Sequence, residues 1–275
     1  MNTHLAPRPL APEVDIAGLS YLRIVRSEWT KLRSLRSTGY TLLAATAMLI
    51  AFGIIDCASI VANWATLSAK EKASVDPLLA SLRGIDGAQL AVGILGVLVI
   101  TGEYATGMVR STFSAVPKRL PVLWAKATVF GVVSLVLTVP AALIAFFASQ
   151  SILDGQHVSI AFSHPGVPRA VIGAALYLTV LGLLALGLGA LIRNTAGAIA
   201  ALVATVFVLP ALISALPRNL KDTIAPYLPT NAGGAITSIH PDPHTLAPWT
   251  GFGVLCAYTA ATLLCAALLL TRRDV

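Results

Sequence analysis

Long uncharged apolar stretches recur along this chain and are its main structural signal. A helix needs about 20 apolar residues to cross the ~30 Å hydrocarbon layer of a bilayer, and the apolar stretches approach or exceed that length. The pattern therefore predicts an all-α polytopic membrane protein with six spanning helices. The predicted spans are residues 40–61, 82–101, 127–147, 170–192, 196–216 and 248–270.

The second span is the weakest of the six. Arg83 and Asp86 leave it an uninterrupted apolar core of only about fifteen residues, or roughly 22 Å of helix. We therefore expect this helix to continue through Glu103 toward the lipid headgroups. Within the third and fifth spans, Pro140 and Pro210 are expected to bend the helices.

Composition agrees with a membrane protein, and charge adds an orientation. Hydrophobic residues make up 56% of the chain, charged residues 11%, and the net charge is +7. In a membrane chain the basic excess orients the helices and meets anionic lipid headgroups, so we expect lipids and no nucleic acid as partners. With both termini in the cytoplasm, 13 of the 19 lysines and arginines lie inside. Residues 1–20 are predicted to be a flexible cytoplasmic tail, and 21–275 a single transmembrane domain.

Residues 22–36 predict an amphipathic helix that lies in the membrane interface and leads into the first span. One face carries Leu22, Ile24, Val25, Trp29, Leu32 and Leu35, and the other mostly Arg23, Arg26, Thr30, Lys31, Arg33 and Ser34. Glu28 falls on the apolar side. Two interpretations of Glu28 are open: a local pair with Lys31 at i+3, or a contact with another cytoplasmic protein surface.

Catalytic chemistry is hard to find in the sequence. It contains no nucleophile elbow, no His-Glu-x-x-His and no phosphate-binding loop, and the three cysteines have no metal-ligand spacing. Ion-coupled transporters carry ionisable residues deep in their spans, whereas Asp56 falls near the outer end of the first span. We therefore expect no catalytic residue and no metal or cofactor site in this chain.

The connection between the second and third spans holds Glu103, Tyr104, Gly107 and Arg110, and it predicts a short helix bounded by Gly107 and Pro117. Glu103 either accepts hydrogen bonds or pairs with a basic residue, or it is a solvated charge at headgroup level. By its residues alone, the segment is also compatible with a basic loop on the membrane surface.

Four segments together resemble a known family. ITGEYATGMVRSTFSAVPKR (100–119) looks like the loop before the third span of type-2 ABC exporter permeases, and SEWTKLRS (27–34), LGALIRNTAGAIA (188–200) and the terminal RRD (272–274) are also similar to that family, particularly its actinobacterial members. Their order and spacing carry the resemblance over nearly the whole chain.

The resemblance implies a permease subunit in the bacterial cytoplasmic membrane. A short cytoplasmic coupling helix near Glu103, Tyr104, Gly107 and Arg110 would dock on a separate ABC ATPase subunit, which binds ATP and Mg. The segment with Glu28, Trp29, Lys31, Leu32 and Arg33 would be the family's elbow helix. A second permease copy or homologue would complete the pathway, and short re-entrant helices would join spans five and six. The alternatives are a secondary transporter, which the sparse intramembrane charge disfavours, and an integral membrane enzyme.

Overall fold

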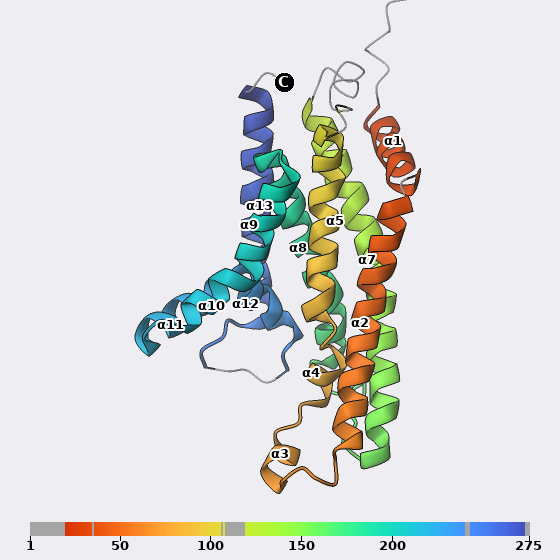
Figure 1. Cartoon of the computed structure of the whole chain (residues 1–275), viewed down its shortest axis with the longest axis vertical. Helices are drawn as coiled ribbons and strands as arrows, with labels where there is room; N and C mark the ends of the chain where they lie inside the picture. The colour runs from red at the N-terminus through yellow and green to blue at the C-terminus, as the bar shows by residue number, and fades with distance from the viewer. Residues whose placement is uncertain (1–19, 35, 106, 108–118, 240–242, 273–275) are drawn as a thin grey trace, which may run out of the picture.

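The computed structural model describes residues 20–34, 36–105, 107, 119–239 and 243–272, and all regular structure in these ranges is helical (Figure 1). Six of the helical segments are long and apolar enough to cross a membrane, which confirms the predicted all-α polytopic fold. These segments are Gly39–Ala62, Ile85–Ala105, Leu120–Gln156, Val167–Ile192, Thr195–Ser214 and Pro248–Arg272.

The individual α-helices follow the chain in this order: α1 Tyr21–Ser34, α2 Arg36–Ala62, α3 Ala69–Ala73, α4 Pro77–Ser81, α5 Ile85–Ala105, α7 Arg119–Leu153, α8 Val167–Ile192, α9 Thr195–Val203, α10 Leu209–Ser214, α11 Arg218–Ile224, α12 Pro229–Gly234 and α13 Pro248–Arg272. Helix α1 and the last turn of α13 lie at the same end of the bundle, as an even number of spans requires (Figure 1). We call this the elbow end.

Helix α8 is the centre of the bundle and contacts α5, α7 and α13. Small residues allow these contacts, since a Cβ atom added at Gly96 of α5 would lie 2.2 Å from the carbonyl oxygen of Gly182 in α8. Gly182, Gly187 and Gly189 of α8 likewise lie in close contact with neighbouring helices. In the most apolar 18 residues of α8, 72% of the residues are buried. In the corresponding stretches of the first and fifth spans, the buried share is 22% and 17%.

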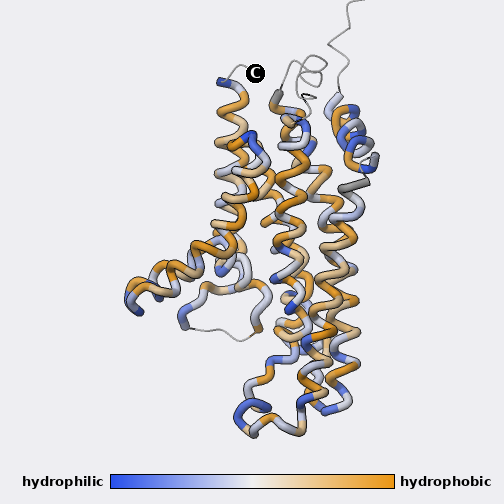
Figure 2. The backbone as a smooth tube through the Cα atoms, viewed as in Figure 1, coloured by the Kyte–Doolittle hydropathy of each residue, from blue (hydrophilic) through white to orange (hydrophobic). Residues whose placement is uncertain are grey.

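Large apolar side chains cover the outside of the bundle. Leu43, Ile55 and Val136 are each more than half exposed, and hydrophobic residues run along the full length of the long helices (Figure 2). In water such a surface would be unfavourable, whereas hydrocarbon is its natural solvent. The exposed surface therefore supports the same conclusion as the apolar length of the helices.

The second and third spans differ in their limits from the sequence prediction. Helix α5 begins at Ile85 after a turn that contains Arg83, and it continues through Glu103 to Ala105, as expected. Helix α7 has 35 residues and starts at Arg119, eight positions before the predicted boundary. The predicted third span began only after Lys126, because a lysine normally marks the end of an apolar span.

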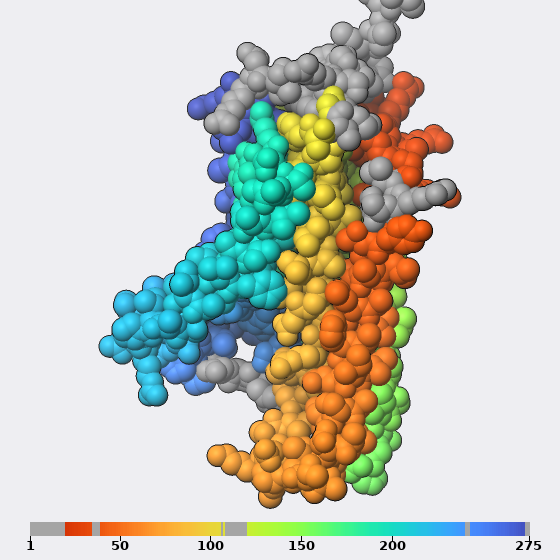
Figure 3. Space-filling model, in the orientation of Figure 1, coloured from red at the N-terminus to blue at the C-terminus, as the bar shows by residue number. Residues whose placement is uncertain are grey.

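The fifth span is irregular near Pro210, where the sequence predicted a bend. Between α9 and α10, residues Ala204–Val208 form a π-helical turn, and Pro210 is the second residue of α10. Proline has no N–H for the helical hydrogen-bond ladder, and a local π turn is one way in which a membrane helix accommodates the resulting break. Helices α10 and α11 then project from the bundle (Figures 1 and 3).

The segment between the fifth and sixth spans contains short helices, which is the part of the expected arrangement that the structure shows. It comprises α11, α12 and two 3₁₀ turns, Ala225–Tyr227 and Ala235–Thr237. Ile236 is fully buried, and it lies against Gly173 of α8. Gly233 lies against Tyr177 of α8 and Leu255 of α13. The part of the segment from α12 onward therefore packs beside α8 and α13, where protein shields its irregular backbone, whereas α11 projects from the bundle.

Candidate functional site

Four charged side chains from three helices meet at the elbow end. They are Glu28 and Lys31 of α1, Glu103 of α5 and Lys126 of α7, and we call them the charge network. The Lys126 ammonium lies 2.5 Å from Glu28 Oε2 and 2.6 Å from Glu103 Oε1. The Lys31 ammonium lies 2.8 Å from Glu28 Oε1 and 3.1 Å from the same Glu103 oxygen. Each lysine therefore bridges both carboxylates, and the contacts form a closed ring.

The charge network is largely withdrawn from solvent. Side-chain exposure is 5% for Glu28, 8% for Lys126, 15% for Glu103 and 28% for Lys31. Two positive and two negative charges balance, so the mutual attraction and hydrogen bonds of the network offset the cost of removing each charge from water. Loss of any one member would leave an uncompensated charge in a buried place.

Local packing explains why Glu28 reaches the other helices. Ile24 of α1 is buried against Val122 and Ala125 of α7, and Glu28 follows one turn later on the same face. Lys126 is the residue after Ala125 and is buried with it. The apolar contact between α1 and α7 thus brings an acidic and a basic side chain together.

The two glutamates raise the pKa of Lys31. Burial alone would lower the pKa of its ammonium, but hydrogen bonds and attraction from Glu28 and Glu103 outweigh burial and raise the pKa above 10.5. Lys31 is therefore fully charged at neutral pH and holds both carboxylates.

The structure decides between the interpretations of the two glutamates. The predicted i+3 pair between Glu28 and Lys31 is confirmed, and the Glu28 carboxylate is too buried to be presented to another protein. Glu103 pairs with basic residues, so the alternative of a solvated headgroup charge is wrong. Sequence reasoning missed Lys126. The available signal was a lysine directly before an apolar run, one helical turn beyond the apolar residues Val122 and Leu123.

The other predicted residues of the connecting segment have different positions. The Tyr104 ring lies 5.6 Å from the Arg193 guanidinium, which belongs to the tight turn between α8 and α9. Gly107 has a φ of +71°, and its N–H donates to the Tyr104 carbonyl oxygen, so this glycine ends the α5 helix. Arg110 and the predicted coupling helix lie outside the described residues.

On α1, Trp29, Leu32 and Arg33 do not join the charge network. Trp29 is half exposed and faces α7 across a groove, Leu32 is half-buried, and Arg33 is exposed. Lys31 was assigned to the polar face of the amphipathic helix, and its ammonium nevertheless reaches Glu103. A long flexible side chain can reach around the helix in this way.

The charge network offers no evident covalent chemistry, because each of its groups is held in an ion pair. Within the described ranges, no group of three or more His, Cys, Asp or Glu side chains is placed to hold a metal ion. Comparison with known families and with curated proteins gives no match to this chain. The arrangement is instead mechanical: it fastens α1, the end of α5 and the start of α7 to one another.

Proposed function

We propose that this chain is the membrane-spanning permease subunit of an ATP-driven ABC-type exporter and that it works with a separate ATPase subunit. The six spans fit such a subunit, and the sequence contains no phosphate-binding loop of its own. The four-segment resemblance described above supplies the family.

The charge network is the observation that carries the proposal. Helix α5 ends at Ala105 and α7 begins at Arg119, so Glu103 and Lys126 flank the segment that would contact the ATPase. Their ion pair joins the two ends of that segment, and Glu28 and Lys31 join both ends to α1. A displacement of the segment would then move three helices together.

A second contact extends this connection across the bundle. Tyr104, next to Glu103, meets Arg193 in the turn between α8 and α9. Arg193 itself has a φ of +56°, an uncommon conformation for a residue with a side chain. The end of α5 is thereby linked to the fifth span as well as to α1 and α7.

The surfaces of the first and fifth spans suggest where a second permease copy or homologue would bind. In α9, Ala198 and Leu202 face the bundle, whereas Ala196 and Ala200 are exposed. A row of small residues on an uncovered helix suits close contact with another helix. If light scattering shows that the purified complex contains only one permease copy, this part of the proposal is contradicted.

The first experiment asks whether the chain has the expected partner. Full-length tagged chain is purified from its native membrane in mild detergent, and the co-purifying proteins are identified. We expect an ATPase with a phosphate-binding loop, with one copy for each permease. Absence of any such ATPase from preparations that retain the six-span chain in folded form would refute the proposed function.

The second experiment tests the charge network as the connection. We expect the Glu103→Gln complex to assemble while the permease-dependent part of its MgATP hydrolysis in lipid nanodiscs falls about fivefold or more, a typical allosteric coupling. Glu71→Gln is the matched control, because Glu71 is exposed in the connection between the first two spans. Wild-type hydrolysis in the Glu103→Gln complex would show that the network does not couple the subunits.

A further inference from the structure

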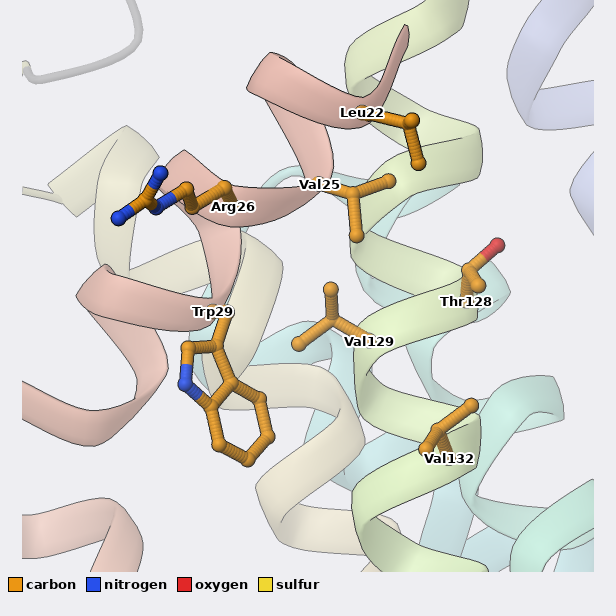
Figure 4. Close-up of a pocket in the computed structure, with 7 residues that line it drawn as sticks. All are labelled: Leu22, Val25, Arg26, Trp29, Thr128, Val129 and Val132. Carbon is orange, nitrogen blue, oxygen red and sulfur yellow. The ribbon is translucent and has the colours of Figure 1, made fainter.

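A groove of about 310 Å³ lies between α1 and α7, on the outside of the bundle (Figure 4). Both walls are helical, and the groove is separate from the charge network. Its lining residues are Leu22, Val25, Arg26, Trp29, Thr128, Val129 and Val132.

The surface of the groove is almost entirely apolar. The Thr128 hydroxyl is already used, because it donates to the Trp124 carbonyl oxygen at 2.8 Å and lies 3.1 Å from the Tyr21 hydroxyl. The only charged lining residue is Arg26, whose guanidinium extends away from α7 at the edge of the groove (Figure 4). In the part of the chain that the structure describes, no carboxylate lies within ion-pair distance of this guanidinium.

The groove continues onto the lipid-facing surface of α7. Val132 is 55% exposed, and Val136, one turn farther along the same face, is 63% exposed. Trp124 and Trp29 lie near the elbow end, where α1 meets the first turns of the third span, and both rings are partly exposed. Partly exposed tryptophans are typical of the boundary between headgroups and hydrocarbon.

We propose that this groove is a binding site for one anionic phospholipid of the leaflet at the elbow end. An acyl chain lies against Val129 and Val132, and the lipid phosphate pairs with Arg26. The apolar walls exclude a free phosphate ion as the occupant, because it would gain nothing from Val25, Val129 or Val132. A neutral lipid would fill the groove and leave the guanidinium without a counter-charge, whereas an anionic lipid satisfies both the apolar walls and the charge.

The experiment uses Trp29 as the reporter within the groove. The full-length chain with Trp64, Trp124 and Trp249 replaced by Phe keeps Trp29 as its single tryptophan. It is placed in phosphatidylcholine nanodiscs with a small share of either brominated phosphatidylglycerol or brominated phosphatidylcholine. Bromine quenches tryptophan only at close range, so the quenching reports which lipid occupies the groove. We expect phosphatidylglycerol to quench more strongly.

Three variants distinguish a built site from a general basic surface. Arg26→Gln should lower the preference for phosphatidylglycerol about fivefold, the usual contribution of one basic residue near a membrane surface. Arg33→Gln is the matched control, because Arg33 is exposed on the same helix but does not line the groove. Val129→Phe fills the groove and should reduce quenching by both lipids.

Two results would overturn the assignment. Equal loss of preference in Arg26→Gln and Arg33→Gln, or no loss in either, would mean that Arg26 does not select the lipid headgroup. Undiminished quenching in Val129→Phe would mean that the acyl chain lies elsewhere. The measurement needs neither ATP nor an ATPase, so its outcome is independent of the proposed transport function.

Discussion

Replacement of Lys126 by Met is the most demanding test of the charge network. Met has a similar length and keeps the apolar stem, so the substitution removes the charge with little change in shape. After the change, Glu28 and Glu103 share one cation, Lys31, at 2.8 Å and 3.1 Å. The network then carries a net negative charge in a place where Glu28 is only 5% exposed.

The expected cost follows from that imbalance. Removing one partner of a buried ion pair typically destabilises a protein by about 3–5 kcal/mol, because the remaining charge is left without compensation. Lys31 still contacts both carboxylates, which places the expected loss toward the lower end of this range. The double variant Lys126→Met with Glu103→Gln restores neutrality, since Glu28 and Lys31 remain as one pair. It should therefore recover much of the lost stability.

The measurement is thermal unfolding of the detergent-solubilised full-length chain, together with the amount assembled in the membrane. Lys70→Met is the control, because Lys70 is exposed in the connection between the first two spans. We expect a clear drop in Tm for Lys126→Met, partial recovery in the double variant and no change for Lys70→Met. An unchanged Tm for Lys126→Met, or a double variant less stable than the single one, would refute the compensation argument.

Lys31, Gly96 and Tyr177 each allow a further test. Because the raised pKa of Lys31 lies above 10.5, the stabilising contribution of Lys31 is present at lower pH and is lost as pH rises through that raised value. Lys31→Met should therefore flatten the alkaline part of a plot of Tm against pH. An unaltered alkaline part in this variant would contradict the argument. Gly96→Ala puts a methyl group against backbone and should cost about 1–3 kcal/mol by thermal unfolding. Gly102→Ala, where the added methyl group meets open space within α5, should be neutral or stabilise by up to about 1 kcal/mol, and equal losses in the two variants would refute the packing argument. Tyr177→Phe removes the 2.6 Å hydrogen bond to Gln89 between α8 and α5, and should cost about 0.6–1.7 kcal/mol; a more stable variant would show that this bond contributes nothing.

Most of the fold could be predicted because a bilayer imposes simple rules on sequence. Apolar length predicts the existence and approximate limits of the spans, and the break in the fifth span follows from Pro210. The limits of α7 could not be predicted in the same way. Its first turns contain Lys126, whose charge is compensated by residues 98 and 23 positions away in the chain. Local hydropathy has no access to that compensation.

The candidate site was only partly visible in the sequence for the same reason. Glu28 on an apolar face and Glu103 at the end of a span were both anomalies, and for each an ion pair was one of the interpretations that the sequence left open. The i+3 spacing identified Lys31 as a partner of Glu28. The link from Lys31 to Glu103, and the second cation at Lys126, depend on how α1 packs against α7. That packing comes from Ile24, Val122 and Ala125, which look like ordinary apolar residues.

Stability alone is a weak explanation for a buried ring of four charges. Well-packed apolar side chains in place of all four would often be equally stable or more stable, because no charge would then be desolvated. Charges differ from apolar groups in their demand for specific partners at short distances. An apolar α1 could slide or rotate on α7 at little cost, whereas Glu28 must face Lys126 and Lys31 must face Glu103. The network therefore fixes the position of α1 relative to α5 and α7, which is what a connection that transmits displacement requires.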